Sequence, residues 1–171
     1  MPLQILLLDT SIHDRSNFKC EDESLIRYLH HHANQDMKKN LTACFVLVDE
    51  DSGDNSVKGY YTLANESISK DKVPGKYKKK IPYKYNVPVT LLGRLARDIS
   101  MKGKGIGEYL LMDALNRSYR ISQSEIGSMA VVVDPINDKA IEFYSKYGFW
   151  SLPDSYRMFL PMNAISKLFD N

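Results

Sequence analysis

The sequence predicts an α/β (α+β) protein in which strands and helices alternate along a single domain, residues 1–171. Three observations carry this prediction. Short apolar runs typical of strands alternate with stretches whose apolar residues recur at helical spacing. A glycine-rich turn joins a buried strand to a helix near the middle of the chain. The length of 171 residues fits one domain with a sizeable core, without internal repeats or linkers.

The first half of the chain predicts three strands and two helices. The three apolar runs rich in strand formers are residues 3–8, 43–48 and 57–64. The acidic, turn-rich stretch 49–56 joins the last two as a hairpin. Acidic residues at 21–23 open a first helix, because carboxylates suit the positive end of a helix dipole, and a second helix follows at about 35–41.

The second half begins with a long irregular stretch at 67–86, which contains Pro74, Gly75 and Pro82. A loop of this length in a compact domain is usually functional or mobile. The central strand and glycine turn come next. The elements expected after them are a helix at about 105–120, a buried strand at 126–133, a helix from about 134 that stops at Gly148, an antiparallel pair at 149–150 and 156–160, and a helical turn at 164–169.

The composition is that of a soluble globular protein, with 43% hydrophobic and 26% charged residues. No apolar run approaches the roughly 20 residues of a membrane helix, so we expect no membrane segment. The apolar run at 3–8 has no basic region before it and does not predict a signal peptide. Cys20 and Cys44 are too few for a disulfide framework and favour reduced thiols, so we expect a cytoplasmic protein.

The net charge of +2 is unevenly distributed. Seven lysines lie between Lys70 and Lys84 against Asp71 alone, a local charge of +6 that leaves −4 for the rest of the chain. Tyr77, Tyr83 and Tyr85 interleave with these lysines, a mixture that can bind phosphates and stack on bases. The alternative for this stretch is an ordinary solvated run of charges. Either way, a basic patch on a mildly acidic body attracts anionic partners.

The stretch 102–107, Lys-Gly-Lys-Gly-Ile-Gly, predicts a phosphate site. Glycines at the start of a helix leave several backbone N–H groups free, and the helix dipole adds positive character there. A flexible loop that happens to contain three glycines is the alternative. The P-loop pattern is excluded because Glu108 follows the last glycine, and the spacing does not match the dinucleotide fingerprint.

Three consecutive histidines, His30, His31 and His32, lie in the first predicted helix. Consecutive helical residues point about 100° apart, so their rings cannot converge on one ion. We therefore interpret them as part of a solvated or partly packed helix end, and the sequence predicts no metal site.

The order of elements resembles the GNAT acyltransferase family over nearly the whole chain, which implies a mixed central sheet of six to seven strands flanked by helices. Two motifs carry the resemblance. The stretch 102–107 is similar to the family's acyl-CoA loop, with lysine at the position where glutamine or arginine is usual. The stretch 137–149 matches the pattern Asn-x-x-Ala-x-x-Phe-Tyr-x-x-x-Gly-Phe.

A closer resemblance is to the GNAT toxins of bacterial toxin–antitoxin systems. It rests on Gly-Tyr-Tyr-Thr-Leu at 59–63, a proline-containing basic loop, and Pro-Val-Thr-Leu-Leu-Gly-Arg-Leu-Ala at 88–96. The resemblance implies acetylation of the α-amino group of an aminoacyl-tRNA by acetyl-CoA, which stops translation. It also implies a homodimer and neutralisation by a small ribbon-helix-helix antitoxin.

The resemblance implies roles for individual residues. Tyr144 is the expected general acid, although its ring could instead only pack against the helix. The expected acetyl-CoA contacts are Leu95, Ala96, Arg97, Lys102, Gly103, Lys104, Gly105, Ile106, Gly107 and Asn137. Asn137 could instead only cap its helix, and Gly93 is the expected site of a strand bulge. The candidate tRNA contacts are Lys78, Lys79, Lys80 and Arg94, while Arg94 and Arg97 could instead be ion-pair partners.

No carboxylate stands out as the general base. Glu66 follows a strand that should flank the acceptor site, but a surface carboxylate is the more ordinary interpretation. The α-amine of an aminoacyl ester is less basic than a lysine side chain, so a dedicated base is not required. Two other functions are consistent with the sequence: acetylation of a protein or small-molecule amine, and a non-catalytic acyl-CoA-binding module.

Overall fold

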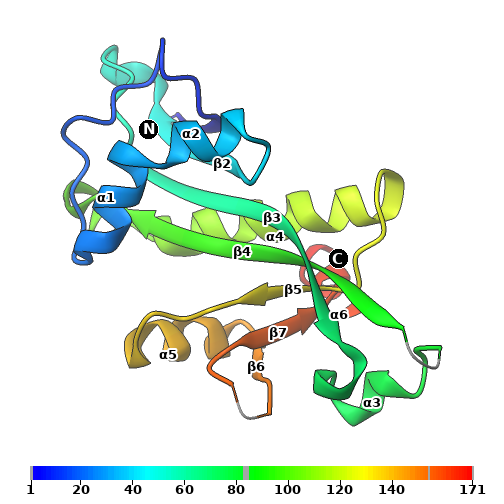
Figure 1. The fold of residues 1–171 in the computed structure, drawn as a ribbon. Helices are drawn as coiled ribbons and strands as arrows, with labels where there is room; N and C mark the ends of the chain where they lie inside the picture. The colour runs from blue at the N-terminus through cyan, green and yellow to red at the C-terminus, as the bar shows by residue number, and fades with distance from the viewer. Residues whose placement is uncertain (1, 83–84, 154, 171) are drawn as a thin grey trace. The chain divides into compact units, whose positions relative to one another are not determined.

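The computed structural model describes residues 2–82, 85–153 and 155–170. In this part of the chain one seven-stranded sheet has the order β1-β2-β3-β4-β5-β7-β6 (Figure 1). The strands are β1 (Leu3–Leu7), β2 (Ala43–Asp49), β3 (Gly59–Ser69), β4 (Asn86–Arg97), β5 (Ala130–Val133), β6 (Trp150–Ser151) and β7 (Met158–Pro161). Strand β4 pairs with β5 in parallel, whereas β5 and β7 pair antiparallel. The predicted mixed sheet flanked by helices is confirmed.

The α-helices are α1 (Glu23–His31), α2 (Ala33–Lys38), α3 (Gly75–Lys78), α4 (Ile106–Ser124), α5 (Asp138–Lys146) and α6 (Met162–Phe169). Three short 3-10 helices are η1 (Glu50–Ser52), η2 (Lys70–Lys72) and η3 (Ile99–Met101). The order of the main elements agrees with the sequence prediction, including the antiparallel pair β6 and β7 near the end of the chain.

The stretch 67–86 differs from the predicted irregular loop. Strand β3 continues to Ser69, and η2 and α3 follow before β4 begins at Asn86. The reason is local packing, because Ile68, Val73 and Tyr77 are buried in one apolar cluster with residues of β4, β5 and β7. Proline and glycine in this stretch correctly indicated turns, but they did not indicate that three apolar side chains between the turns are buried.

The chain divides into two compact units. One consists of residues 1–64 and 93–114, and the other consists of residues 65–92 and 115–171. The prediction of a single domain over residues 1–171 stays a prediction.

The first unit is built on β1, β2 and the first part of β3, with α1 and α2 packed near β2 (Figure 1). Its core is aromatic. Phe18 contacts Tyr60 edge-to-face with ring centroids 5.6 Å apart, and Tyr28 stacks on Tyr60 at 6.4 Å. Gly59 is required by close packing, because a Cβ there would lie 3.0 Å from Leu110 Cδ1 and 3.2 Å from the Ala96 carbonyl oxygen.

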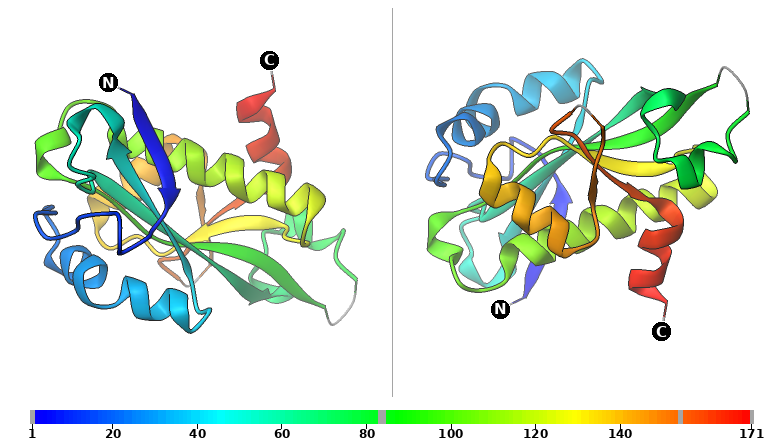
Figure 2. Two further views of the ribbon diagram at one scale, coloured as in Figure 1. Left: turned by 90° about the horizontal axis from the view of Figure 1, so that it is seen from above. Right: turned by 90° about the horizontal axis from the view of Figure 1, so that it is seen from below.

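The second unit is built on β5 and β7, both buried along their whole length. Their backbones pair from Ala130↔Pro161 to Val133↔Met158. Helix α6 follows β7 directly, and Figure 2 shows it (red) leading to the C-terminus. Within the residues described, no helix has both the length and the apolar character needed to cross a membrane.

Candidate active site

The glycine turn before α4 has open backbone donors. Gly103 and Gly105 have φ values of +80° and +72°, a left-handed conformation that favours glycine. A Cβ at either position would meet nothing within 4 Å, so the turn is open on that side. In the described part of the chain, four N–H groups of the turn have no protein acceptor: those of Gly103, Gly105, Ile106 and Gly107.

These donors lie at the start of a 19-residue helix, where the dipole is positive. The exposed side chains of Lys102 and Lys104 add charge to the turn, and the buried Ile106 anchors it to the core. The arrangement fits the phosphates of an acyl-CoA, because it offers several N–H groups and positive charge without a carboxylate among residues 99–107.

Asp98 fixes the backbone that leads into the turn. Its side chain is buried and accepts hydrogen bonds from the backbone N–H groups of Lys19 and Ser100, both at 2.9 Å, and from the Ser100 hydroxyl at 2.5 Å. Burial by itself would raise the pKa of Asp98, but hydrogen bonds from Ser100 and Lys19 outweigh it and hold the pKa below its usual value. Asp98 is therefore an ionised anchor.

Residues 95–97 form the end of β4, in the same unit as the turn. Ala96 is buried, and Leu95 and Arg97 are half-buried. Arg97 Nη2 contacts Glu21 Oε1 at 3.1 Å, so the ion-pair interpretation of Arg97 is confirmed. Its Nη1 is buried and has no hydrogen-bond partner within the described residues. This donor remains available to a ligand, and the acetyl-CoA contact of Arg97 stays a prediction.

Tyr144 lies in the last turn of α5 with 8% of its surface exposed. Its ring packs edge-to-face against Phe143 and Phe149, at centroid distances of 5.2 and 5.3 Å. Burial raises the pKa of the Tyr144 phenol above its usual value, so the phenol stays protonated over a wider pH range. No described residue accepts a hydrogen bond from its hydroxyl. A buried, protonated phenol without an internal acceptor can donate a proton to a substrate.

The end of α5 holds Tyr144 in place. The Phe149 N–H donates to the Tyr144 carbonyl at 3.2 Å, and the Gly148 N–H donates to the Ser145 carbonyl at 3.0 Å. This pair of bonds is the Schellman ending of a helix, with Gly148 at φ +96° in the left-handed position. The prediction that the helix stops at Gly148 is confirmed.

Asn137 caps the start of α5. Its side-chain oxygen accepts a hydrogen bond from the Ala140 N–H at 2.8 Å, and its backbone is extended. The capping role is therefore confirmed. A contact of Asn137 with acetyl-CoA stays a prediction.

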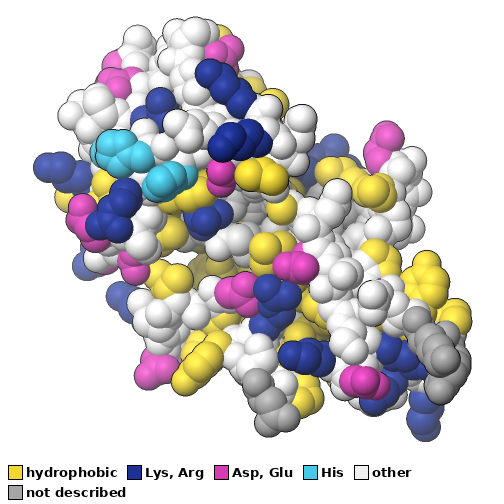
Figure 3. Space-filling model, viewed as in Figure 1, with side chains coloured by type: hydrophobic (Ala, Val, Ile, Leu, Met, Phe, Trp, Pro, Cys, Tyr) yellow, Lys and Arg dark blue, Asp and Glu magenta, His cyan; other side chains and the backbone are white. Residues whose placement is uncertain are grey.

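The lysine-rich stretch is more ordered than a solvated loop. Lys70 donates from Nζ to the Ile81 carbonyl at 2.8 Å, and Lys78 lies 3.9 Å from Asp71. Lys79 and Lys80 are exposed, and Lys78 is half-exposed. Figure 3 shows Lys and Arg side chains gathered over α3, at the lower right. This surface can contact phosphates.

The interpretation of Tyr77 as a stacking residue for bases is wrong. Tyr77 is only 6% exposed and packs against Trp150 and Phe159, at centroid distances of 5.7 and 6.2 Å. Tyr85 is 54% exposed and remains available. Tyr83 and Lys84, which belong to the predicted basic patch, lie outside the described residues.

Arg94 lies in β4 with its guanidinium carbon 3.4 Å from the centroid of the Tyr28 ring. The described residues include no ion-pair or hydrogen-bond partner for it, so the ion-pair interpretation of Arg94 is not supported. Sequence reasoning missed Tyr28, because residues that meet only in the folded chain carry no spacing signal.

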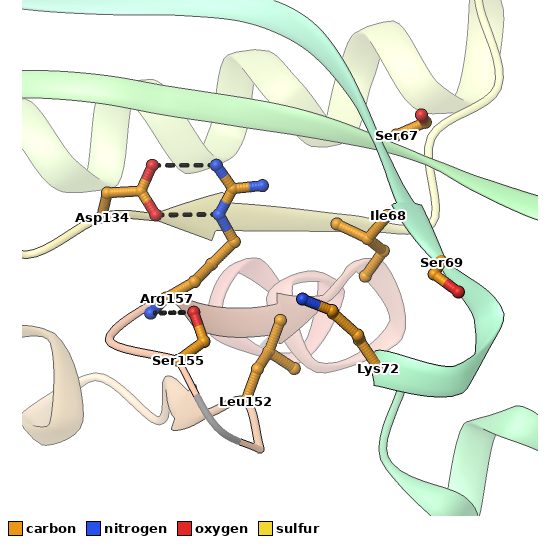
Figure 4. A pocket seen from close by; sticks show the side chains of 8 residues that line it. All are labelled: Ser67, Ile68, Ser69, Lys72, Asp134, Leu152, Ser155 and Arg157. Carbon is orange, nitrogen blue, oxygen red and sulfur yellow. Dashed lines mark hydrogen bonds and ion pairs between the residues drawn. The ribbon is translucent and has the colours of Figure 1, made fainter.

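A polar pocket of about 350 Å³ lies in the second unit (Figure 4). It is lined by Ser67, Ile68, Ser69, Lys72, Asp134, Leu152, Ser155 and Arg157. Arg157 donates from Nε to Asp134 Oδ1 at 2.8 Å and from Nη2 to Asp134 Oδ2 at 2.9 Å. Sequence reasoning missed this ion pair, because its residues are 23 positions apart and lie outside the motifs.

Glu66 belongs to the same cluster, since its Oε2 lies 3.7 Å from Arg157 Nη2. Hydrogen bonding to Asp134, with further attraction from Asp134 and Glu66, raises the pKa of Arg157. Glu66 is engaged by the cluster of Arg157 and Asp134, so the geometry favours a structural role for Glu66 over general-base catalysis.

The remaining candidates carry no chemistry of their own. Cys20 and Cys44 are free thiols, and burial raises the pKa of Cys44 to about 12. Figure 3 shows histidine side chains (cyan) gathered over α1, where His31 and His32 are exposed. No three His, Cys, Asp or Glu residues of the described ranges are placed to hold a metal ion.

The chain is similar to curated proteins over most of its length. It is 35% identical over 136 residues to a tRNA-acetylating toxin of Mycobacterium tuberculosis (strain ATCC 25618 / H37Rv), covering 80% of this chain and 78% of the relative. It is 30% identical over 169 residues to the probable toxin TacT of Sinorhizobium fredii (strain NBRC 101917 / NGR234), covering 94% and 92%. No protein-family model matches the chain.

Solved structures agree with these relatives. AtaT complexed with acetyl-methionyl-tRNAfMet superposes with a TM-score of 0.89 at 32% identity, covering 98% of this chain and 99% of that one. AtaTR bound with acetyl-CoA gives 0.85 at 33% identity, covering 98% of each chain. A tyrosine-to-phenylalanine variant of AtaT bound to the C-terminus of the antitoxin AtaR gives 0.83 at 28% identity, covering 99% of each.

The structure and the relatives support the same conclusion. The structure contributes the open glycine turn, the buried phenol of Tyr144, and the sheet with its flanking helices. The chain is an acetyl-CoA-dependent acetyltransferase. It belongs to the family of tRNA-acetylating toxins, which are GNAT enzymes.

Proposed function

We propose that this chain transfers the acetyl group of acetyl-CoA to the α-amino group of an aminoacyl-tRNA and thereby blocks translation. The observation that carries the proposal is the combination of an open phosphate site at the start of α4 with a protonated, unpartnered phenol at the end of α5. The relative solved with acetyl-methionyl-tRNAfMet supports the choice of acceptor.

The start of α4 binds the phosphates of acetyl-CoA in this proposal. The N–H groups at 103–107 and the ammonium groups of Lys102 and Lys104 supply the positive field. The backbone of Leu95, Ala96 and Arg97 hydrogen-bonds the amides of the pantetheine arm as an added strand. Acetyl-CoA supplies the activated acetyl group.

The chemistry is a direct acyl transfer. The neutral amine attacks the thioester carbonyl, the new N–C bond forms, and the C–S bond breaks. The pKa of an α-amine, near 8, leaves a useful neutral fraction of the amine at neutral pH. The nitrogen becomes positively charged when the N–C bond forms, and it then loses one proton to water. Tyr144 gives its phenolic proton to the departing thiolate and is reprotonated by solvent, so protons balance over the cycle.

The exposed lysines beside α3 bind the RNA in this proposal. Lys78, Lys79 and Lys80 lie in one short stretch whose backbone is held by α3 and by the packing of Tyr77. Contacts between lysines and phosphates weaken steeply with salt, because binding releases condensed counterions.

The same relatives support a proposal for the biological setting. An enzyme that acts on aminoacyl-tRNA must work in the cytoplasm, where translation takes place. AtaT has been solved with the C-terminus of its antitoxin AtaR, and the AtaT–AtaR complex with DNA. We expect a comparable small DNA-binding antitoxin of the ribbon-helix-helix type for this chain, and a homodimeric enzyme.

Acetyl transfer from labelled acetyl-CoA to a charged total tRNA pool tests the proposal, with deacylated tRNA as the blank. We expect label only on charged tRNA, and mass spectrometry of the released aminoacyl group identifies the acceptor. Transfer to proteins or small amines, with none to charged tRNA from an enzyme that binds acetyl-CoA, would reject the proposed acceptor.

Replacing Lys78, Lys79 and Lys80 by Gln tests the RNA surface. We expect the KM for charged tRNA to rise by roughly tenfold and its salt dependence to weaken, with acetyl-CoA affinity unchanged. A matched control replaces three exposed lysines elsewhere in the same unit: Lys139, Lys146 and Lys167. Equal effects of the two triple variants would mean that net charge, not this surface, attracts the RNA.

A further inference from the structure

The side chain of Arg94 lies over an aromatic ring. Its guanidinium carbon lies 3.4 Å from the centroid of Tyr28, within the range of a stacked cation–π contact. The ring itself is fixed, because Tyr28 is only 5% exposed and its hydroxyl donates to Asp36 Oδ2 at 2.9 Å. Tyr28 also stacks on Tyr60, with the two rings inclined by 13°. The guanidinium therefore has a rigid platform.

Arg94 differs from the other partly buried arginines in its partners. Arg15 donates to the Leu29 carbonyl at 2.8 Å, Arg97 contacts Glu21, and Arg157 binds Asp134 through two hydrogen bonds. Within the ranges that the structure describes, Arg94 makes neither a hydrogen bond nor an ion pair. Its exposure is intermediate, so part of its hydration is lost without replacement.

A guanidinium that is positioned by a ring and has no hydrogen-bond partner can bind an anion with little rearrangement. Stacking occupies a face of the plane and leaves the N–H donors along its edge free. Two of these donors match two oxygens of a phosphate, which gives a charge-assisted bidentate contact. Because the platform already restricts the side chain, less conformational entropy is lost when the anion binds.

The helices nearby carry charges of both signs. From Asp22, which caps α1, to Lys39 the charged residues are Asp22, Glu23, Arg27, Asp36, Lys38 and Lys39, and Asp36 is engaged by Tyr28. His31 and His32 are also exposed there, and Figure 3 shows the histidine side chains with Lys and Arg nearby. Within the described residues no carboxylate is paired with Arg94, so its charge is available to an anion.

The acetyl-CoA contacts expected at residues 95–97 use the backbone of the strand, whereas Arg94 offers the donors of its side chain. Side chains alternate along a strand, so Arg94 shares a face of β4 with Ala96, and Leu95 points to the other face. Ala96 belongs to the apolar cluster of Tyr28 and Tyr60, which agrees with the position of Arg94 over Tyr28. The phosphates of acetyl-CoA already have donors at the start of α4.

We propose that Arg94, seated on Tyr28, is the receptor for a phosphate group of the RNA substrate. The inference rests on the proposed function for the identity of the RNA, and it adds a preformed, single-residue contact to the diffuse attraction of the lysines beside α3. The shared chemistry is phosphate recognition, which acetyl-CoA could also supply, and the experiment separates the two sources.

The experiment compares wild type with Arg94→Gln, Arg94→Lys and Tyr28→Phe. Arg94→Gln should raise the KM for charged tRNA roughly tenfold, leave kcat within about twofold, and lower the salt slope of tRNA binding by about 1. Arg94→Lys should fall between wild type and Arg94→Gln, because it keeps the charge and loses the planar fork. Tyr28→Phe keeps the ring but loses the hydrogen bond to Asp36 that fixes it, so it should raise the KM for charged tRNA by less than Arg94→Gln does.

Three further measurements complete the test. An aminoacyl ester without a phosphodiester should be acetylated equally well by wild type and Arg94→Gln. Arg120→Gln, an exposed arginine on α4, is the matched control and should change none of these values. Thermal unfolding of Arg94→Gln checks that the variant is folded.

The outcomes separate the alternatives. Weakened acetyl-CoA affinity in Arg94→Gln would assign the residue to the cofactor and overturn the inference. An unchanged KM and salt slope for tRNA would leave Arg94 a packing residue and would also overturn it. Direct binding of deacylated tRNA to both proteins tests the phosphate contact even if wild type transfers no acetyl group, so failure of the proposed function is seen separately.

Discussion

Helices α4 and α5 carry the two sequence motifs, but they begin in opposite ways. Helix α4 starts in a glycine turn whose N–H groups have no protein acceptor in the described part of the chain. Helix α5 starts at Asn137, whose side chain satisfies the Ala140 N–H at 2.8 Å. The first helix start has no side-chain cap among the described residues, whereas at the second a side chain of the motif caps one of the N–H groups.

The ends of the two helices complete the contrast. Helix α5 closes with a Schellman ending around Gly148 that holds Tyr144 in its last turn. We interpret α4 as contributing backbone donors and α5 as contributing a side chain. The difference teaches that a polar motif residue at a helix start can be structural, whereas an open glycine turn leaves room for a ligand at the backbone donors.

The largest expected effect tests the side-chain role of α5. Tyr144→Phe removes the proton donor and keeps the ring that packs on Phe143 and Phe149. We expect kcat to fall about a hundredfold or more, with acetyl-CoA affinity unchanged, measured by steady-state transfer and calorimetry. Because burial raises the pKa of Tyr144, loss of its proton should not limit kcat below about pH 10. A variant with wild-type kcat would remove Tyr144 as the acid.

The second effect tests the backbone role of α4. Gly105→Ala puts a Cβ on a residue at φ +72°, which costs about 1–2 kcal/mol and shifts the turn. We expect acetyl-CoA to bind about tenfold more weakly, since several donors move together. Gly127→Ala is the matched control, because this glycine also has open space around its Cβ but is not in the left-handed region. Equal affinities in the two variants would contradict the assignment of the phosphate site.

The smallest effect tests whether the start of α5 is only structural. Asn137→Ala removes the cap and should lower the free energy of unfolding by about 1 kcal/mol, as measured by denaturant titration. Asn137→Asp keeps a capping oxygen and should retain most of that stability. If Asn137 only caps, acetyl-CoA affinity stays at the wild-type value in both variants. Weaker binding in both, at preserved stability in Asn137→Asp, would restore the cofactor contact.

Elements with strong local signals were predictable from the sequence. The apolar runs gave β1, β2 and β5, and the glycine at 148 marked the end of α5. Boundaries were less accurate, since β5 begins at Ala130 rather than near 126, and α4 continues to Ser124 rather than 120. Such ends depend on strand pairing and helix fraying, which local patterns do not encode.

The contacts that define the site's surroundings were not predictable in the same way. Arg94 and Tyr28 are 66 positions apart, and only the packing of α1 against the sheet brings them together. Arg157 was not singled out, although its two hydrogen bonds to Asp134 order one wall of the pocket. From the sequence, Tyr77 was predicted to be a stacking residue because it lies among lysines. In the structure its ring is buried in the core and packs against Trp150. Motifs locate the chemistry, while side-chain partners across the fold come from topology.

The open turn at the start of α4 makes the stability of the folded enzyme depend on the concentration of acetyl-CoA. Any ligand that binds only the folded state adds RT ln(1 + [L]/Kd) to its stability, which is about 2.7 kcal/mol at a hundredfold excess over Kd. The N–H groups of the turn have no acceptor among the described residues, so a bound acetyl-CoA replaces the water that solvates them. A cell rich in acetyl-CoA would therefore hold more of this enzyme folded, and starvation for acetyl-CoA would shorten its lifetime before any change in its synthesis.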